Sequence, residues 1–265
     1  MNRIGVFGAN GRMGLALVEA AHKNNNAELG AAYVRSSSPL LNLAVNQLNS
    51  AAPVAMDFSD ERNVEDIDVL IDFTLPAGMR EHLKTAIKQK IPMVIGTTGL
   101  NDNDMQTLQA AAQHIPIVFA RNYSVGVNLL LNLVQTAATK FGDDLDIEIF
   151  EAHHRHKIDA PSGTALAIGE AIAEAKGWVH DDVAVFDRSQ VEKEKSQNEI
   201  GYSVLRGGDI VGEHTAYFAT SGERLELTHK ASSRMTFALG AVRAAGWLKN
   251  KPVGLYDMQD VLDLK

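Results

Sequence analysis

The first half of the chain is organised around the turn in residues 3–14, which reads Arg3-Ile4-Gly5-Val6-Phe7-Gly8-Ala9-Asn10-Gly11-Arg12-Met13-Gly14. An apolar run, Ile4–Phe7, precedes the turn, and apolar residues at helical spacing follow it from Arg12 to Asn24. Three glycines spaced G-x-x-G-x-x-G permit a tight turn and let the backbone approach a pyrophosphate at the N-terminus of a helix. Asn10 takes the position at which such turns usually carry their second glycine. The pattern predicts a strand, a phosphate-binding turn and a helix; a plain turn without a ligand is the alternative.

Strands and helices continue to alternate up to about residue 124. We expect further strands at Leu29–Val34, Val69–Phe73, Pro92–Ile95 and Ile115–Ala120, and helices at Leu40–Leu48, Met79–Gln89 and Asp102–Gln113. Strands separated by helices imply βαβ units and a parallel sheet. The strand runs lack polar–apolar alternation, as expected when both faces of a sheet are buried. The predicted fold class is therefore α/β, with residues 1–124 forming a Rossmann-like, doubly wound dinucleotide-binding domain.

The pattern changes after residue 124. A strand at Leu145–Ala152 and a helix at Thr164–Lys176 are followed by strands at Ile200–Leu205, Ile210–Ala219 and Arg224–Thr228. The last two strands alternate polar and apolar residues, which is typical of a sheet with one exposed face. Residues 125–233 are predicted to form an α+β domain with a mixed, mostly antiparallel sheet. Phe237–Leu248 returns to a helical pattern.

Composition excludes several classes of protein. The chain has 265 residues, of which 45% are hydrophobic and 22% charged, as in ordinary globular proteins. No uninterrupted apolar run is long enough for a membrane span, and the absence of cysteine excludes disulfides and a thiol nucleophile. The net charge of −8 makes general binding to nucleic acid or to an anionic membrane unfavourable. A structural pattern that starts at residue 3 leaves no room for a leader, so a cytoplasmic location is expected.

The end of the second strand bears on the choice of cofactor. NAD sites usually place an acid about 20 residues after the glycine turn, where it binds the ribose hydroxyls. That region here contains Val34 and Arg35 followed by three serines, and Arg12 could face the same pocket. Arginines and hydroxyls suit the 2′-phosphate of NADPH. The alternative is that Arg35 is an ordinary surface cation.

Two further turns follow strands of the same predicted sheet. They read Gly96-Thr97-Thr98-Gly99 and Ala120-Arg121-Asn122-Tyr123-Ser124. Ligands of open α/β sheets bind beyond the carboxyl ends of the strands, so both turns are candidate cofactor contacts. Each could instead be an ordinary tight loop.

The densest chemistry in the sequence lies in residues 151–164, Glu-Ala-His-His-Arg-His-Lys-Ile-Asp-Ala-Pro-Ser-Gly-Thr. Five consecutive residues, 153–157, are His, Arg or Lys, although the protein as a whole is acidic. A helix begins just after Pro161, so the amides of Gly163 and Thr164 are suited to hold a carboxylate or phosphate. Histidine and a desolvated lysine also offer proton transfer near neutral pH. The alternatives are a solvated basic strand, a metal site disfavoured by the neighbouring cations, and an anion site without catalysis.

Together these motifs resemble the 4-hydroxy-tetrahydrodipicolinate reductase (dihydrodipicolinate reductase) family of the diaminopimelate route to lysine. The run from Glu151 to Thr164 is the most specific match. The other matching motifs follow in the right order over essentially the whole chain: Gly8–Gly14, Ile71–Thr74, Gly96–Gly99, Asn122–Asn128, Gly207–His214 and Thr228–Arg234.

The resemblance implies roles for individual residues. His153 and Lys157 match proton donors, and His154, Gly163 and Thr164 match positions that bind a dicarboxylate. The matching cofactor positions are Gly8, Ala9, Asn10, Gly11, Arg12, Met13, Gly96, Thr97, Thr98, Ala120, Arg121, Asn122 and Tyr123. The resemblance also implies a homotetramer assembled through residues 125–233, with residues 234–265 returning to the nucleotide domain.

One position departs from the family. Many members carry Glu before the arginine at the end of strand two and use NADH and NADPH alike. Val34 stands at that position here, followed by Arg35. We therefore expect NADPH to be preferred over NADH.

The implied reaction is hydride transfer to a small cyclic imine that bears two carboxylates, with a proton delivered by His153 or Lys157. It needs no metal and no covalent nucleophile. Two alternatives stay open: a two-domain oxidoreductase for a sugar or amino acid, and a regulator that binds NADPH without turnover. NADPH oxidation with the condensation product of pyruvate and aspartate semialdehyde would distinguish them.

Overall fold

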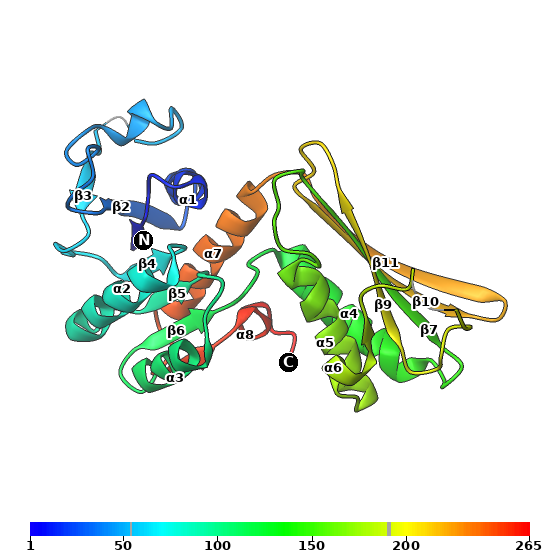
Figure 1. The fold of residues 1–265 in the computed structure, drawn as a ribbon. Helices are drawn as coiled ribbons and strands as arrows, with labels where there is room; N and C mark the ends of the chain where they lie inside the picture. The colour runs from blue at the N-terminus through cyan, green and yellow to red at the C-terminus, as the bar shows by residue number, and fades with distance from the viewer. Residues whose placement is uncertain (54, 190–191) are drawn as a thin grey trace. The chain divides into compact units, whose positions relative to one another are not determined.

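The structure, a computed structural model, describes residues 1–53, 55–189 and 192–265 (Figure 1). By its contacts the chain divides into two compact units. Unit 1 contains Met1–Val125 together with Arg234–Lys265, and unit 2 contains Gly126–Ser233. Both ends of the chain thus belong to unit 1, whereas unit 2 is one continuous segment.

The described part of unit 1 contains one sheet of seven parallel strands, in the order β3-β2-β1-β4-β5-β6-β12. Their bounds are β1 Asn2–Phe7, β2 Ala27–Val34, β3 Phe58–Asp60, β4 Val69–Asp72, β5 Met93–Ile95, β6 Pro116–Phe119 and β12 Gly254–Tyr256. The strand order reverses between β1 and β4, where doubly wound folds open a crevice for a ligand. The predicted Rossmann-like parallel sheet is confirmed.

Helices cover both faces of this sheet, which explains why its strands read as continuous apolar runs. One core packs α1 and α7 against the sheet, and a second core packs α2 and α3 against the other face. The helices of unit 1 are α1 Arg12–His22, α2 Pro76–Gln89, α3 Asp102–Ala111, α7 Met235–Leu248 and α8 Met258–Leu262. Side chains of α7 such as Ala241 and Ala245 are completely buried, so the C-terminal segment is part of this core.

The helix expected at Leu40–Leu48 is wrong. The structure has one turn of 3-10 helix there, Val45–Gln47. Asn42 adopts a positive φ of 65°, which a helix does not allow. Backbone hydrogen bonds from Val45 to Met56 and from Phe58 to Leu43 tie the segment to the chain that follows it. These pairings replace the helical bonds that the apolar pattern had indicated.

Unit 2 has a mixed sheet in the order β11-β10-β7-β9-β8. Strand β10 pairs antiparallel with β7 and β11, whereas β9 pairs parallel with β7 and β8. The strands are β7 Asp146–His153, β8 Ala184–Val185, β9 Ile200–Arg206, β10 Gly212–Thr220 and β11 Glu223–Ala231. The mixed sheet expected after residue 124 is confirmed.

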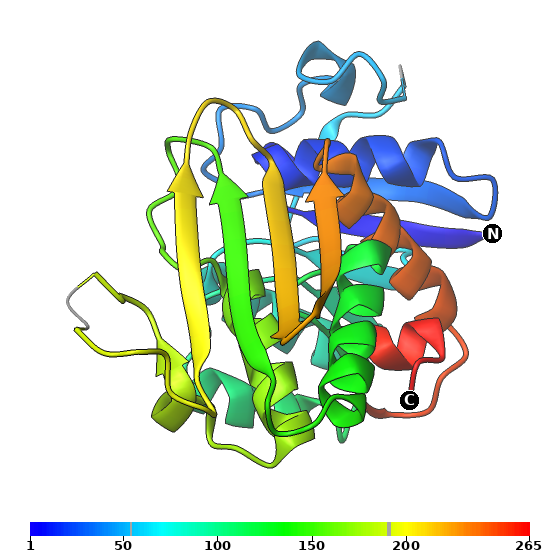
Figure 2. The same cartoon turned by 90° about the vertical axis from the view of Figure 1, so that its right-hand side faces the viewer.

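The helices of unit 2 lie on one face of this sheet (Figure 2). They are α4 Val125–Lys140, α5 Gly163–Lys176 and the short α6 His180–Val183. Ile147 and Ile149 of β7 pack in the core between α4, α5 and the sheet. Because side chains alternate along a strand, Glu151 and His153 continue the same face of β7 toward the start of α5. Glu151 and His153 therefore lie at the end of the row of buried apolar side chains on this face of β7.

Candidate functional site

The glycine turn follows β1 at the carboxyl edge of the parallel sheet. Gly8 has a φ of +62°, a conformation that favours glycine. A β-carbon at Gly14 would overlap the backbone of Gly8 and Ala9, so glycine there lets α1 pack directly on the turn. The N-cap of α1 is Gly11, which has no side chain to cap the first amides of the helix. These amides are therefore suited to a phosphate group.

The turn after β5 supports the same assignment. Thr97 is 1% exposed, and its hydroxyl oxygen has no hydrogen-bond partner among the described residues. A buried polar group without a partner is costly, so this hydroxyl fits a ligand that supplies one. Gly96 precedes it, and Thr98 is exposed. The residues present thus fit a dinucleotide at the carboxyl ends of β1 and β5.

The segment Ala120–Tyr123 follows β6 at the same edge of the sheet. Arg121 is exposed, and the side-chain oxygen of Asn122 accepts a hydrogen bond from the Ser124 amide. Tyr123 differs from its neighbours because its side chain is buried and its hydroxyl lies 2.8 Å from the carbonyl oxygen of Ile95. Its phenol therefore links β6 to β5, which leaves only its backbone to face a ligand.

Arg35 directly follows β2 and is exposed, as is Arg12 in the first turn of α1. Within the described residues neither guanidinium forms an ion pair or hydrogen bond. Val34 is 1% exposed and packs in the core of unit 1. The position at which the family resemblance implies an acid is thus occupied by a buried apolar side chain.

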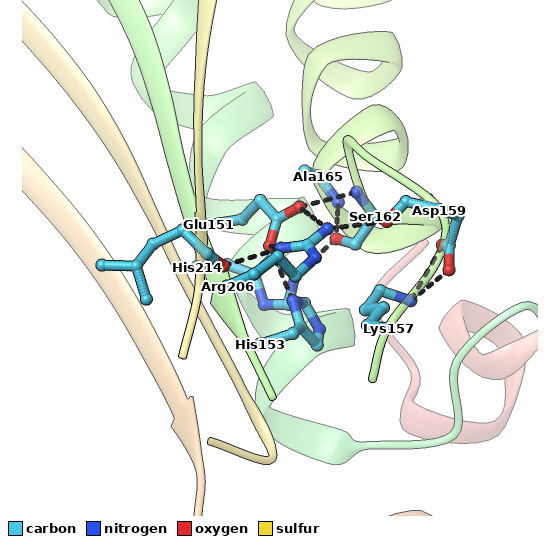
Figure 3. A network of polar contacts seen from close by, with 9 residues as sticks. Glu151, His153, Lys157, Asp159, Ser162, Ala165, Arg206 and His214 are labelled. Atoms are coloured by element: carbon cyan, nitrogen blue, oxygen red, sulfur yellow. Dashed lines mark hydrogen bonds and ion pairs between the residues drawn. The ribbon is translucent and has the colours of Figure 1, made fainter. Parts of the chain in front are cut away.

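In unit 2, the buried carboxylate of Glu151 organises the end of β7 (Figure 3). Its Oε2 lies 2.6 Å from Nδ1 of His153. The guanidinium of Arg206 donates to both carboxylate oxygens, each over 2.8 Å. The amide of Ser162 donates to Oε1 over 2.9 Å. A bidentate arginine and two further donors leave this carboxylate fully paired.

These partners determine the ionisation of Glu151 and the orientation of His153. Burial alone would raise the pKa of Glu151, but the hydrogen bonds from His153, Arg206 and Ser162 outweigh it and lower the pKa to about 2. An ionised Glu151 accepts the proton on Nδ1 of His153, so Nε2 is the nitrogen that exchanges a proton. A β-carbon at Gly212 would lie 3.0 Å from this Nε2, so the glycine leaves it room.

The start of α5 is built on the same cluster. Ser162 is the N-cap of α5, and its Oγ accepts the Ala165 amide over 3.2 Å and lies 2.9 Å from Nε2 of His214. Burial, followed by the charge of His153, lowers the pKa of His214 to about 3, so His214 is neutral at pH 7. Gly163 is exposed, and a β-carbon on it would meet nothing within 4 Å. The side-chain position of Gly163, in the first turn of α5, therefore faces open space.

The loop between β7 and α5 holds the remaining predicted residues. His154 is half-buried, and the Lys157 amide donates to its carbonyl oxygen. The ammonium group of Lys157 lies 2.8 Å from a carboxylate oxygen of Asp159 (Figure 3). Burial would raise the pKa of Asp159, but the Lys157 partner lowers it. The structure thus brings the five predicted substrate residues into one region, with Lys157 paired to an acid.

The sequence analysis assigned no role to Glu151, Ser162, Arg206 or His214, which belong to this cluster. Glu151 could have been found, because it lies two residues before His153 and a strand places such residues on one face. Arg206 and His214 come from strands β9 and β10, and register places Arg206 opposite His153 and His214 opposite Glu151. That register is a long-range property, which no local pattern reveals.

The described residues lack two further features. They contain no group of three histidines or acids arranged to hold a metal ion. None of their helices is long and apolar enough to cross a membrane.

Comparisons with known proteins show which family the chain resembles over its whole length. The family model described as dihydrodipicolinate reductase, N-terminus, matches residues 2–123, and the one described as dihydrodipicolinate reductase, C-terminus, matches residues 126–262. A 4-hydroxy-tetrahydrodipicolinate reductase of Pseudoalteromonas translucida is 82% identical over 100% of this chain and 99% of its own. The reductase of the same name from Pseudoalteromonas atlantica is 55% identical over 100% of both chains.

Solved structures show the same relationship. A dipicolinate-bound dihydrodipicolinate reductase from a Paenisporosarcina species has a TM-score of 0.75 at 26% identity, over 98% of both chains. Scyllo-inositol dehydrogenase from Lactobacillus casei, at 16% identity and a TM-score of 0.60 over 100% of this chain and 93% of its own, shares the fold alone. With both family models matched and close relatives aligned over their full lengths, the chain belongs to the dihydrodipicolinate reductase family.

Proposed function

We propose that this protein reduces 4-hydroxy-tetrahydrodipicolinate to tetrahydrodipicolinate in the diaminopimelate route to lysine, with NADPH as its preferred cofactor. The relative that is 82% identical carries the name of this activity. The observation that carries the proposal is the contact between His153 and the buried, ionised Glu151, whose other oxygen accepts the Ser162 amide at the N-terminus of α5. Overall, the substrate gains a hydride and a proton and loses its hydroxyl group as water.

The nucleotide would be held by the glycine turn and by the turns after β5 and β6. When bound, the reduced nicotinamide supplies the hydride. The amides at the start of α1 would bind its pyrophosphate, and the Thr97 hydroxyl would gain a partner that the described residues do not supply.

His153 is the proton donor in this proposal. Glu151 holds the ring through Nδ1, so Nε2 is the nitrogen that faces the substrate in this proposal. The proton goes to the ring of the substrate, which becomes electron-rich as it receives the hydride. Lys157 is the second candidate for this transfer, and its ammonium group would have to exchange Asp159 for the substrate.

One carboxylate of the substrate would bind at the amides of Gly163 and Thr164, assisted by His154. The first amides of a helix and the helix dipole both favour an anion at the N-terminus. The Paenisporosarcina relative is described as dipicolinate-bound, so an enzyme of this family accepts a planar dicarboxylate. That description supports a cyclic dicarboxylate as substrate.

The preference for NADPH rests on the end of β2. Arg35 and Arg12 are exposed there without an ion-pair partner among the described residues, so both are available to a 2′-phosphate. The buried Val34 neither bonds the ribose hydroxyls nor repels the phosphate. We further propose a homotetramer assembled through unit 2, where β11 leaves most of its side chains exposed, and a cytoplasmic location.

The test is NADPH oxidation in the presence of the freshly formed condensation product of pyruvate and aspartate semialdehyde. Turnover that ceases when either precursor is omitted is the expected result. NADPH binding without turnover would instead indicate a nucleotide-sensing regulator, and turnover with a sugar or amino acid alone would indicate another oxidoreductase.

A further inference from the structure

The motif Ile71–Thr74 has no role in the function described so far. Strand β4 ends at Asp72 and lies between β1 and β5 in the sheet. The loop that follows β4 therefore lies between the glycine turn and the turn at Gly96. Its conformation therefore affects these two neighbouring turns, which are proposed to hold the nucleotide.

Contacts tie this loop to each predicted cofactor segment. A β-carbon at Gly8 would lie 2.7 Å from the methyl group of Thr74, so Thr74 packs directly on the glycine turn. The Phe73 ring packs against Gly96 and lies 5.2 Å from the ring of Tyr123. A shift of this loop would thus disturb all three cofactor segments.

Asp72, the last residue of β4, fixes the start of this loop through hydrogen bonds. Its side chain is completely buried. Oδ1 accepts the amide of Thr74 over 2.7 Å, and the Asp72 carbonyl accepts the amide of Gly96 over 2.8 Å. Oδ2 lies 2.6 Å from Nδ1 of His82. The position of Asp72 therefore depends on a histidine that reaches it from α2.

His82 also contacts a second acid, Glu61, in addition to Asp72. It is 5% exposed and stacks on the ring of Phe7, the last residue of β1, at 3.8 Å. Its Nε2 lies 3.2 Å from Oε2 of Glu61, whose amide donates to the carbonyl of Val34 at the end of β2. One imidazole thus connects the ends of β4, β1 and β2.

Two carboxylates on one imidazole require it to be protonated, because neutral histidine has one N–H and can donate to only one of them. Among the described residues, Asp72 from β4 and Glu61 from the segment after β3 are the charged groups in contact with His82, and Phe7 from β1 is apolar. Burial lowers the pKa of His82, but the bonds to Asp72 and Glu61 raise it by more, so it stands above its ordinary value. The stabilisation from the two bonds of His82 is fully present below the ordinary pKa of histidine. It is lost as the pH rises through the raised pKa of His82.

We propose that His82 is a positioning residue for the nucleotide site, and that its protonated form holds the loop after β4 in the conformation that binds the cofactor. Loss of the proton frees Glu61 and loosens the loop, so nucleotide affinity falls as the pH rises. The inference rests on the proposed use of a nicotinamide cofactor, but not on the identity of the substrate.

The experiment measures the Kd of NADH by fluorescence titration between about pH 6 and pH 9. NADH is the probe because it lacks the 2′-phosphate, which itself titrates near pH 6. We expect the wild-type Kd to rise about fivefold over this range, the lower end of ordinary coupling between two sites. His82→Asn keeps a donor for Asp72 but does not titrate, so its Kd should be weak and independent of pH.

Two further variants separate this role from general stability. Glu61→Gln keeps an acceptor at a half-buried position but removes its charge, so the rise in Kd should move to lower pH. His114→Asn changes an exposed histidine of the same unit and should leave the curve unchanged. In turnover assays, the changes should appear in KM for the cofactor rather than in kcat.

Each outcome decides between the proposals. A wild-type Kd that does not change with pH, or the wild-type rise persisting in His82→Asn, would overturn the role of His82. A Glu61→Gln curve that superimposes on the wild-type curve would do the same. Normal nucleotide curves without turnover of the dicarboxylate would overturn only the proposed substrate, whereas no nucleotide binding at any pH would overturn both proposals.

Discussion

Replacing Glu151 by Gln should damage catalysis and stability together. An amide of the same size accepts bonds on only one of its two polar atoms, so it cannot receive His153, Ser162 and both nitrogens of Arg206. Its NH₂ group would face another donor. Arg206 would then keep a positive charge without its buried counter-ion.

The size of the effect follows from the pKa of Glu151. A fall in pKa from 4.5 to about 2 corresponds to about 3 kcal/mol in favour of the ionised, folded form. Because the folded pKa is depressed, this stability is present above about pH 4.5 and is lost as the pH falls toward 2. Glu151→Gln should therefore unfold more easily in urea at pH 7, by an amount of this order. The difference from wild type should shrink as the pH falls below 4.5.

Catalysis should fall by about 10²-fold in kcat, because Nδ1 of His153 loses the carboxylate that orients the ring. Glu148→Gln is the matched control on the same strand. The Glu148 carboxylate is 39% exposed and pairs with Lys195, so its loss should cost less than about 1 kcal/mol and leave kcat unchanged. A Glu151→Gln enzyme with wild-type kcat, pH–rate profile and stability would refute the reasoning.

Four further variants test the rest of the site. His153→Ala should lower kcat by about 10² or more at nearly unchanged NADPH affinity, and turnover close to the wild-type rate would end its assignment as the proton donor. Thr164→Val should weaken planar pyridine dicarboxylate inhibitors by about 1–2 kcal/mol, measured as Ki at constant fold by circular dichroism. Arg35→Ala should raise KM for NADPH and reduce a wild-type preference over NADH of at least about tenfold in kcat/KM, measured at low salt; a wild-type ratio near one would contradict the cofactor proposal. Gly14→Ala should lose nucleotide binding and thermal stability together, since its methyl group would overlap the turn at Gly8.

The parallel sheet could be predicted because its signals are local. Glycines at a turn and apolar runs of strand length lie next to each other in the sequence. The strands of this sheet that were not predicted, β3 and β12, have three residues each. They form by pairing with an existing edge rather than through a pattern of their own. Helix α4 escaped because polar residues such as Asn128 interrupt its apolar run, although Asn128 is buried in the structure.

The residues of the candidate site also differ in whether a local sequence pattern reveals them. His153 through Lys157 are neighbours in sequence, so their concentration of charge was visible. Arg206 stands 55 residues away from Glu151 and reaches it only because β9 pairs parallel with β7. The buried position of Val34 also depends on packing. Val34→Glu would place a carboxylate in the core and cost stability before it could alter the choice of cofactor.

The division of unit 1 between the two ends of the chain has a consequence for biosynthesis on the ribosome. When synthesis reaches Ser233, all residues of unit 2 have been made. Unit 1 still lacks helix α7 and strand β12, which lies at one edge of its sheet. Side chains of α7 fill the core on the face that also holds α1, so unit 1 cannot close before the last segment emerges. Nascent chains usually complete their N-terminal domain first; here the order is reversed, and the first residues made must wait for the last ones before they can bind a nucleotide.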